Sequence, residues 1–141
     1  EELKQTYELI TTVPGIGMQN ALCLLIFTNN FKRFNLNPRK IACYYGVAPF
    51  GKDSGTSVHA DPHVHYMANK MLKSMLTQAA LASVNFCPLI KDYYNRLINR
   101  GKKKQVVLNN VKNKLIHIIT AMVKNNQPFN PEYINIHKTA A

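Results

Sequence analysis

Apolar residues recur at intervals of three and four along most of this chain, and this spacing predicts an all-helical fold. The pattern is clearest in two long segments, 66–84 and 105–124. Their apolar residues are Met67, Met71, Leu72, Met75, Ala79 and Ala82 in the first, and Leu108, Val111, Leu115, Ile118, Ile119 and Met122 in the second. We expect the methionine stripe of the first segment to belong to the core rather than to a cofactor site.

Proline, glycine and asparagine residues mark the ends of further helices. Asn37 can cap a helix that begins at Pro38. Pro88 can open another, which Gly101 can close. We therefore expect helices at 3–10, 19–27, 38–46, 66–84, 89–99 and 105–124. The prediction is a single helical domain over 1–130, with a helical core at 66–124 and an extended or frayed tail at 131–141; its size suits one domain.

The first two predicted helices are joined by Val13-Pro14-Gly15-Ile16-Gly17, which has the layout of a helix-hairpin-helix over about residues 3–27. Glycines let backbone N–H groups approach a phosphate, and the N-terminus of the following helix adds a favourable dipole. We expect Gly15, Ile16 and Gly17 to bind the nucleic-acid backbone without reading its sequence. A purely structural tight turn between packed helices is the alternative.

A glycine-rich and proline-rich segment at 46–62 contains Lys52-Asp53-Ser54-Gly55-Thr56-Ser57-Val58. Three hydroxyls surround Gly55 there, so the backbone can turn sharply and present a side-chain oxygen to a ligand. A serine that attacks a phosphodiester needs a base for its proton and cations to offset the developing charge. Lys52 supplies a cation nearby, but no base is evident, and the segment alone also fits an ordinary solvated turn.

The chain is strongly basic, with 18 Lys and Arg against 7 Asp and Glu, a formal charge of +11 and a pI near 9.7. Such a balance favours polyanions through phosphate contact and counterion release. Half of the basic residues lie between 91 and 124, where Asp92 is the one acid. A nucleic-acid surface is one interpretation, and a solvated helix face is the other. The residues expected to bind phosphate are Lys52, Lys70, Lys73, Arg100, Lys102, Lys103 and Lys104.

The histidines do not predict a metal site. His59-Ala60-Asp61-Pro62-His63-Val64-His65 has imidazole and carboxylate groups at short spacing, but Pro62 forces an extended path and no fourth ligand is evident. These residues also fit a polar loop with occasional phosphate contacts. His117 lies in an apolar segment, and we expect it to be packed and hydrogen-bonded.

Composition also bounds the compartment. No apolar run approaches the ~18 residues needed to span a bilayer, so we expect a soluble chain without a membrane partner. Cys23, Cys43 and Cys87 show no CxxC spacing and suit reduced core thiols in a cytoplasm. Glu1-Glu2-Leu3-Lys4 lacks both an initiator Met and the features of a signal peptide, so we expect part of a longer protein.

Several motifs in a fixed order carry a family resemblance over about residues 5–130. They are Val13-Pro14-Gly15-Ile16-Gly17, Phe31-Lys32-Arg33-Phe34, Ile41-Ala42-Cys43-Tyr44-Tyr45-Gly46-Val47-Ala48-Pro49, Ser54-Gly55-Thr56-Ser57-Val58, Ala68-Asn69-Lys70-Met71-Leu72-Lys73, Tyr93-Tyr94-Asn95-Arg96-Leu97, Gly101-Lys102 and Val111-Lys112-Asn113-Lys114-Leu115. Together they resemble the C-terminal transposase domain of the Piv-type bacterial insertion-sequence transposases, relatives of the Piv DNA invertase.

This resemblance implies a DNA recombinase built from two parts. An N-terminal RuvC-like domain would hold divalent metal, expected to be Mg²⁺, on four acidic residues, and this chain would supply the nucleophile. Ser54 matches the family serine, which is thought to form a covalent phosphoserine link to DNA. The resemblance also implies homo-oligomers and, in some members, a structured guide RNA. No cofactor is expected in this chain, which alone should bind nucleic acid but cleave it poorly.

The segment after the serine departs from the family pattern. Many relatives carry arginines there, whereas this chain has no Lys or Arg between Lys52 and Lys70. The grip on phosphate would then depend on Lys70, Lys73 and the later basic residues. Two other hypotheses stay open. One is a helix-hairpin-helix module that binds nucleic acid without chemistry, and the other is a purely structural or protein-binding helical domain whose basic charge is incidental.

Overall fold

α-Helices form in each of the six segments where the apolar spacing predicts them. The computed structural model describes residues 1–47 and 66–132, with residues 66–69 described as backbone only. The elements are α1 (Glu2–Thr11), α2 (Met18–Phe27), a 3-10 turn η1 (Lys32–Phe34), α3 (Pro38–Tyr44), α4 (Tyr66–Phe86), α5 (Pro88–Asn99) and α6 (Lys104–Asn125). No strand is present within these ranges, so the predicted all-α class is confirmed.

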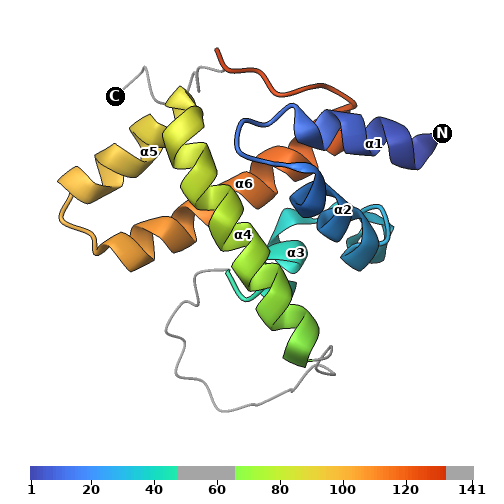
Figure 1. Cartoon of the computed structure of the whole chain (residues 1–141), viewed down its shortest axis with the longest axis horizontal. Helices are drawn as coiled ribbons and strands as arrows, with labels where there is room; N and C mark the ends of the chain where they lie inside the picture. The colour runs from blue at the N-terminus through green and yellow to red at the C-terminus, as the bar shows by residue number, and fades with distance from the viewer. Residues whose placement is uncertain (48–65, 133–141) are drawn as a thin grey trace.

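Helix α6 is the centre of the domain. It packs against α4, α5, α3 and α1, and α2 packs against α1 and α4. Figure 1 shows α4 crossing over α6, with α5 and α6 forming a hairpin on one side and α1 to α3 on the other. The segment from 48 to 65, which contains Ser54, lies outside the described residues. The last described residue before it is Val47, and α4 begins after it at Tyr66.

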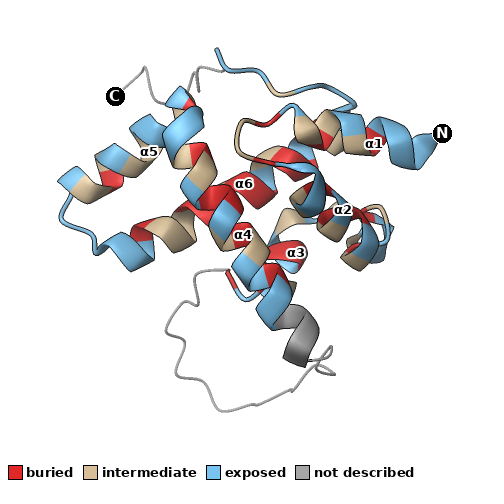
Figure 2. Cartoon of the chain, viewed as in Figure 1, coloured by how far each residue is buried: buried red, intermediate tan, exposed pale blue. Residues whose placement is uncertain are grey.

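The core consists mainly of aliphatic side chains from every α-helix, together with the buried ring of Phe31. Figure 2 shows the buried residues concentrated where α4, α6 and α3 meet. Ile10, Ile41, Ile90, Leu115 and Ile119 are each 0% exposed. Full burial of one such side chain stabilises the fold by roughly 1.5–3 kcal/mol relative to exposure. Packing of these residues, rather than helix propensity, therefore supplies most of the stability of the short helices.

The buried face of α4 differs in part from the predicted methionine stripe. Leu72 and Ala79 are buried as expected, but Met71 is 47% exposed and Met75 is only half-buried. Leu76 and Ala80 occupy the core in their place. The reason is that α4 contacts α2, α5 and α6 together, so its buried face is set by three neighbours at once.

Local turn chemistry agrees with the sequence. The side chain of Asn37 accepts hydrogen bonds from the N–H groups of Arg39 and Lys40, 3.0 and 3.2 Å away, and caps α3. Gly101 adopts a φ of +82° after α5, as expected of a helix-ending glycine. Asn29 and Asn30 end α2 with left-handed backbone. The 3-10 turn that follows was not predicted.

Two expectations about single residues are wrong. Cys87 is buried, but Cys23 is only half-buried and Cys43 is exposed, so the three free thiols are not all core residues. His117 is exposed on α6, because the core-facing positions around it are Ile116 and Ile119. The structure records no hydrogen bond from His117 to another described residue.

The chain beyond α6 remains close to the domain as far as it is described. The backbone N–H of Phe129 donates to Thr12 Oγ1 at 2.9 Å, and the half-buried Phe129 ring packs against the core. Residues 133–141 lie outside the described range. Within the described helices, none combines the length and apolar character that crossing a membrane requires.

Candidate nucleic-acid interface

The turn between α1 and α2 is packed against α4. Gly15 has a φ of +97°, and a Cβ built on it would lie 2.5 Å from the backbone N of Ser83 and 2.6 Å from its Oγ. Ser83 Oγ also donates to the carbonyl oxygen of Pro14 at 2.8 Å. Ile16 is 5% exposed and its side chain lies in the core. Gly15 and Ile16 thus hold the turn in place against α4.

Of the three residues of this turn that are predicted to bind the nucleic-acid backbone, Gly17 is the one exposed to solvent. It is exposed and precedes α2 with extended backbone, and no atom lies within 4 Å of a Cβ built on it. No side chain caps the start of α2. The first N–H groups of a helix have no intrahelical acceptor. The exposed start of α2 therefore offers uncapped donors and a positive dipole end to an anion.

The remaining described basic residues of the prediction lie on two other parts of the surface. Arg100, Lys102, Lys103 and Lys104 are exposed around the α5–α6 turn, and Lys70 and Lys73 are exposed near the start of α4. In Figure 1 the α5–α6 turn lies at the left, and the start of α4 at the bottom right. The structure does not gather these residues into one cluster. They would meet separate parts of an extended polyanion.

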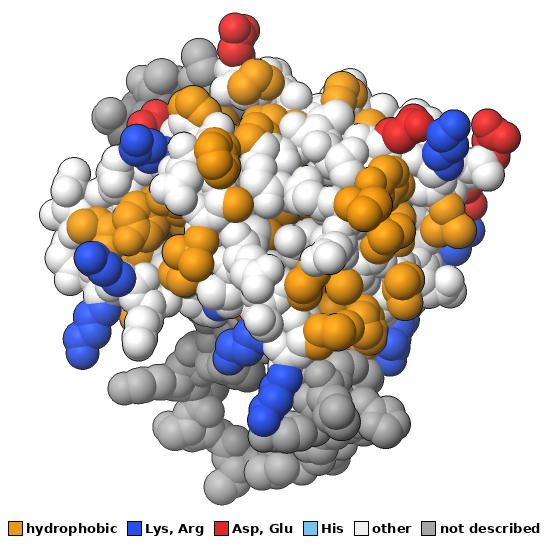
Figure 3. Space-filling view, in the orientation of Figure 1, with side chains coloured by type: hydrophobic (Ala, Val, Ile, Leu, Met, Phe, Trp, Pro, Cys, Tyr) orange, Lys and Arg blue, Asp and Glu red, His pale blue; other side chains and the backbone are white. Residues whose placement is uncertain are grey.

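Charge is unevenly distributed on the face shown in Figure 3. Acidic side chains lie along its upper and right edges. In its lower part, the charged side chains among the residues drawn in colour are all basic. The ion pairs of the described residues join Lys4 to Glu8 and Lys32 to Glu2. Both ion pairs involve an acidic residue of α1.

The catalytic prediction falls outside the described residues. Ser54, Gly55, Thr56, Ser57 and Lys52 all lie between 48 and 65. One flank of that segment is anchored, because the side-chain amide of Asn109 on α6 donates to the carbonyl oxygen of Val47 at 3.1 Å. The exit of α3 is therefore tied to the middle of the domain.

No metal site is present in the described parts of the chain. They contain no group of three or more His, Cys, Asp or Glu side chains arranged to hold a metal ion. The His59, Asp61, His63 and His65 cluster lies outside them. The described side chains thus do not form a site for a divalent cation.

Sequence reasoning missed a cluster around Arg33. Its guanidinium carbon lies 4.9 Å from the ring centre of Tyr44 and 5.5 Å from that of Phe34, and its Nη1 lies 3.4 Å from the Tyr44 hydroxyl. Cation–π contacts of this kind fix a guanidinium on an aromatic surface. The only sequence signal was an arginine beside phenylalanine, and the contact with Tyr44 depends on how η1 packs on α3.

Titratable groups on α6 have perturbed pKa values. Although His117 is exposed, partial desolvation by the surrounding protein, and then the positive charges of Arg39 and Lys114, lower its pKa below the ordinary 6.5. Burial, and then Lys73, lower the pKa of Lys112 below 10.5. Both shifts disfavour the charged form of the side chain, and in both the neighbouring charges are basic.

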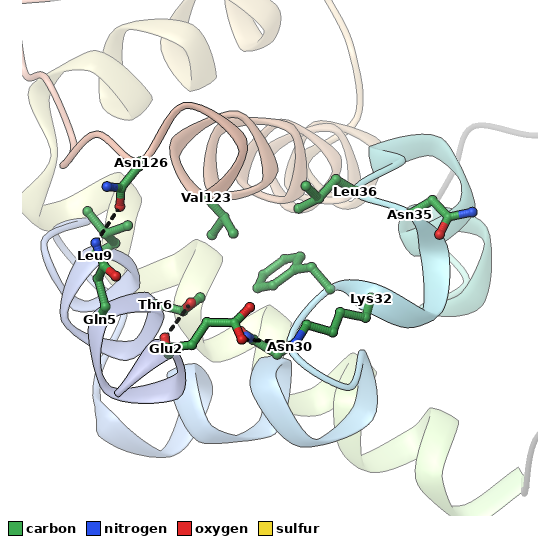
Figure 4. Close-up of a pocket in the computed structure, with 11 residues that line it drawn as sticks. Glu2, Gln5, Thr6, Leu9, Asn30, Lys32, Asn35, Leu36, Val123 and Asn126 are labelled. Carbon is green, nitrogen blue, oxygen red and sulfur yellow. Dashed lines mark hydrogen bonds and ion pairs between the residues drawn. The ribbon is translucent and has the colours of Figure 1, made fainter.

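A surface hollow of about 500 Å³ lies between α1, η1 and the end of α6, away from the predicted site. Figure 4 shows Glu2 reaching toward Lys32 and Gln5 toward Asn126 across its rim. The Lys32–Glu2 ion pair measures 2.9 Å, and Gln5 Nε2 donates to Asn126 Oδ1 at 2.9 Å. Because its charged groups neutralise each other, this hollow does not extend the basic surface.

Fold and charge together define a basic helical domain. The lysines and arginines predicted to bind phosphate are exposed wherever the structure describes them, and the start of α2 at Gly17 is open to solvent. The chain belongs to the IS116/IS110/IS902 family of transposases, whose model matches residues 7–95, from α1 through most of α5.

Named relatives agree with this assignment. The chain is 30% identical over 129 residues, 91% of its length, to pilin gene-inverting proteins of Moraxella lacunata and Moraxella bovis, and covers 40% of each. It is 32% identical over 116 residues, 82% of its length, to an insertion element IS110 protein of Streptomyces coelicolor, of which it covers 28%. The chain thus spans less than half the length of these relatives.

Proposed function

We propose that this chain is the DNA-binding and serine-nucleophile domain of a Piv-type DNA transposase or site-specific recombinase. The observation that carries the proposal is the similarity to pilin gene-inverting proteins over 91% of the chain. The Ser54 segment also lies inside residues 7–95, which match the transposase family. Inversion of a gene requires DNA strands to be cut and rejoined. The basic surface and the exposed start of α2 suit the binding part of that task.

Ser54 is the residue proposed to carry the chemistry. Its Oγ would form a bond to the scissile phosphorus, while the bond from that phosphorus to one deoxyribose oxygen breaks. The serine proton passes to a base, and the departing oxygen receives a proton. Because the original phosphodiester energy is kept in the phosphoserine link, a second deoxyribose hydroxyl can reverse the step and join a new strand.

The base and the metal would come from another part of the protein. Five of the seven acids of the chain are described, and they form no metal-binding group. We propose that a RuvC-like domain supplies four carboxylates and Mg²⁺. The full-length protein would act on DNA as a homo-oligomer in a bacterial cytoplasm. It would use a structured guide RNA if it follows those relatives that do.

The deciding experiment uses the full-length protein and Ser54→Ala. The variant should abolish strand exchange and the covalent protein–DNA adduct while its DNA affinity stays within about twofold of the unmodified protein, since one hydroxyl contributes little to backbone binding. Thr56→Ala and Ser57→Ala are matched controls that remove a neighbouring hydroxyl and should retain the adduct.

An unchanged rate of strand exchange in Ser54→Ala would show that Ser54 is not the nucleophile. It would favour the second candidate, a helix-hairpin-helix module that only binds nucleic acid, for which the exposed start of α2 at Gly17 is the specific support. Binding that neutralises phosphates releases counterions, so the affinity for DNA should fall as salt rises. An affinity for DNA that does not depend on salt would contradict both DNA-binding hypotheses and favour a protein-binding domain.

A further inference from the structure

Lys112 occupies a core position of α6. It is 7% exposed and begins a row of residues spaced by four, followed by Ile116 at 1% and Thr120 at 2%. Residues four apart on a helix lie on the same face. The Thr120 hydroxyl is satisfied by the carbonyl oxygen of Ile116 at 2.7 Å. Lys112 is therefore the one charged group in a face that otherwise packs into the domain.

No described carboxylate balances this charge. The ion pairs of the described residues join Lys4 to Glu8 and Lys32 to Glu2, and neither involves α6. Burial lowers the pKa of Lys112, and the positive charge of Lys73 on α4 lowers it further. Burying an ammonium group without a partner is costly, and a second cation beside it adds to the cost.

The two lysines come from the helices that form the centre of the fold. α4 and α6 cross directly over each other (Figure 1), and Leu72 and Val111, the residues that precede Lys73 and Lys112 in the sequence, are buried. Lys73 itself is exposed, so the pair extends from the buried Lys112 to the surface. Asn109, one helical turn before Lys112, is the residue that holds the carbonyl of Val47.

We infer that Lys112 and Lys73 bind one backbone phosphate of DNA between them, at the crossing of α4 and α6. A phosphodiester carries one negative charge and two non-bridging oxygens, so each ammonium group can donate to a different oxygen. The anion offsets the repulsion between the lysines and supplies the partner that Lys112 lacks among the described residues. The inference rests on the proposed DNA-binding function and adds a defined phosphate site to it.

The test measures binding of a fluorescent DNA duplex of arbitrary sequence to the 141-residue chain over a range of salt concentrations. The variant is Lys112→Met, which keeps an unbranched side chain of nearly the same length and removes its charge. We expect affinity to fall about tenfold, the loss typical of one charge-assisted hydrogen bond. The slope of log affinity against log salt should become shallower by about 0.9, the value for one phosphate contact.

Two further variants make the comparison specific. Lys73→Met should reproduce the loss, and the double variant should lose less than the product of the single effects, because both lysines hold the same phosphate. Lys124→Met removes one charge from an exposed position on the same helix and should change affinity by less than about twofold. Thermal melting should show Lys112→Met to be at least as stable as the unmodified chain, since an unpaired buried charge is removed.

Each other outcome overturns the inference in a distinguishable way. Unchanged affinity and salt slope in Lys112→Met would mean that the lysine binds no phosphate, even though the chain binds DNA. A lower melting temperature with unchanged affinity would mean that Lys112 belongs to an internal ion pair. An affinity loss for an RNA duplex but not for DNA would place RNA at the site. A complete lack of salt-dependent binding by the unmodified chain would reject the DNA-binding function itself.

Discussion

Gly15 and Ser83 are in direct contact, so that the α1–α2 turn rests on the later half of α4. A Cβ on Gly15 would lie 2.5 Å from the Ser83 backbone N and 2.8 Å from its Cα. The neighbouring Pro14 carbonyl accepts a hydrogen bond from Ser83 Oγ. A contact made by backbone atoms on both sides cannot be relieved by rotating a side chain. The turn that could present N–H groups to DNA is thereby held in one position.

Gly15→Ala should destabilise the chain by about 3 kcal/mol, because alanine is strained at a φ of +97° and its Cβ would overlap α4. The free energy of unfolding from urea titration measures the effect. Gly17→Ala is the matched control: its φ is −87° and no atom lies near its Cβ, so a loss below about 1 kcal/mol is expected. Equal losses in both variants would show that the contact with Ser83 does not stabilise the fold.

Leu72→Ala should cost about 3 kcal/mol, since Leu72 is 1% exposed and its removal leaves a cavity between α4 and its neighbours. Met71→Ala, at the adjacent and 47% exposed position, should cost less than about 1 kcal/mol. Urea unfolding of the two variants compares them directly. The reverse order would mean that the methionine side of α4 faces the core, as the apolar spacing alone predicts.

Asn37→Ala should reduce stability by about 1 kcal/mol, because the N–H groups of Arg39 and Lys40 lose their acceptor. Asn95→Ala, at an exposed position within α5, provides the comparison and should change stability by less than about 0.5 kcal/mol. Thermal unfolding of both variants is sufficient. If Asn37→Ala behaves like Asn95→Ala, water replaces the cap without loss.

His117 predicts a dependence of stability on pH. Its folded pKa lies below the ordinary 6.5, so between these two values the unfolded chain binds more protons than the folded chain. Stability contributed by neutral His117 is therefore present above pH 6.5 and is lost as the pH falls toward the folded pKa. His117→Gln should lose less stability than the unmodified chain between about pH 7.5 and about pH 5.5. Urea unfolding at both pH values measures this, and an identical loss would contradict the shift.

Features that depend on neighbouring residues in the sequence were predictable, whereas features that depend on contacts between distant segments were not. The six helices and the Asn37 cap were predictable because apolar spacing and capping act over a few neighbouring residues. The exposure of His117 was not predictable from the sequence, because a residue of α6 is buried only where another helix packs over it. The contact of Arg33 with Tyr44 likewise depends on a 3-10 turn between left-handed residues, for which the sequence offered no clear signal.

For the candidate site, motif order predicted a bacterial insertion-sequence transposase, and the match of residues 7–95 to the IS116/IS110/IS902 transposase family confirms that part of the prediction. The Piv-type and C-terminal assignments stay predictions. The roles of Ser54 and of the basic residues stay predictions. The structure separates Gly17, which is exposed, from Gly15 and Ile16, which pack inward. It also brings Lys112 close enough to Lys73 for their positive charges to interact, although the two residues are far apart in the sequence.

By itself, the sequence determined the helical class, the helix ends, the basic charge and the resemblance to DNA transposases, because each depends on residue type, local spacing or motif order. Tertiary structure alone decided which face of α4 is buried and which part of the α1–α2 turn remains open. It also decided that a lysine of α6 is buried where the positive charge of a lysine on α4 acts on it. These features arise from helices that cross each other after long separations in sequence, and burial and charge at a crossing depend on both partners.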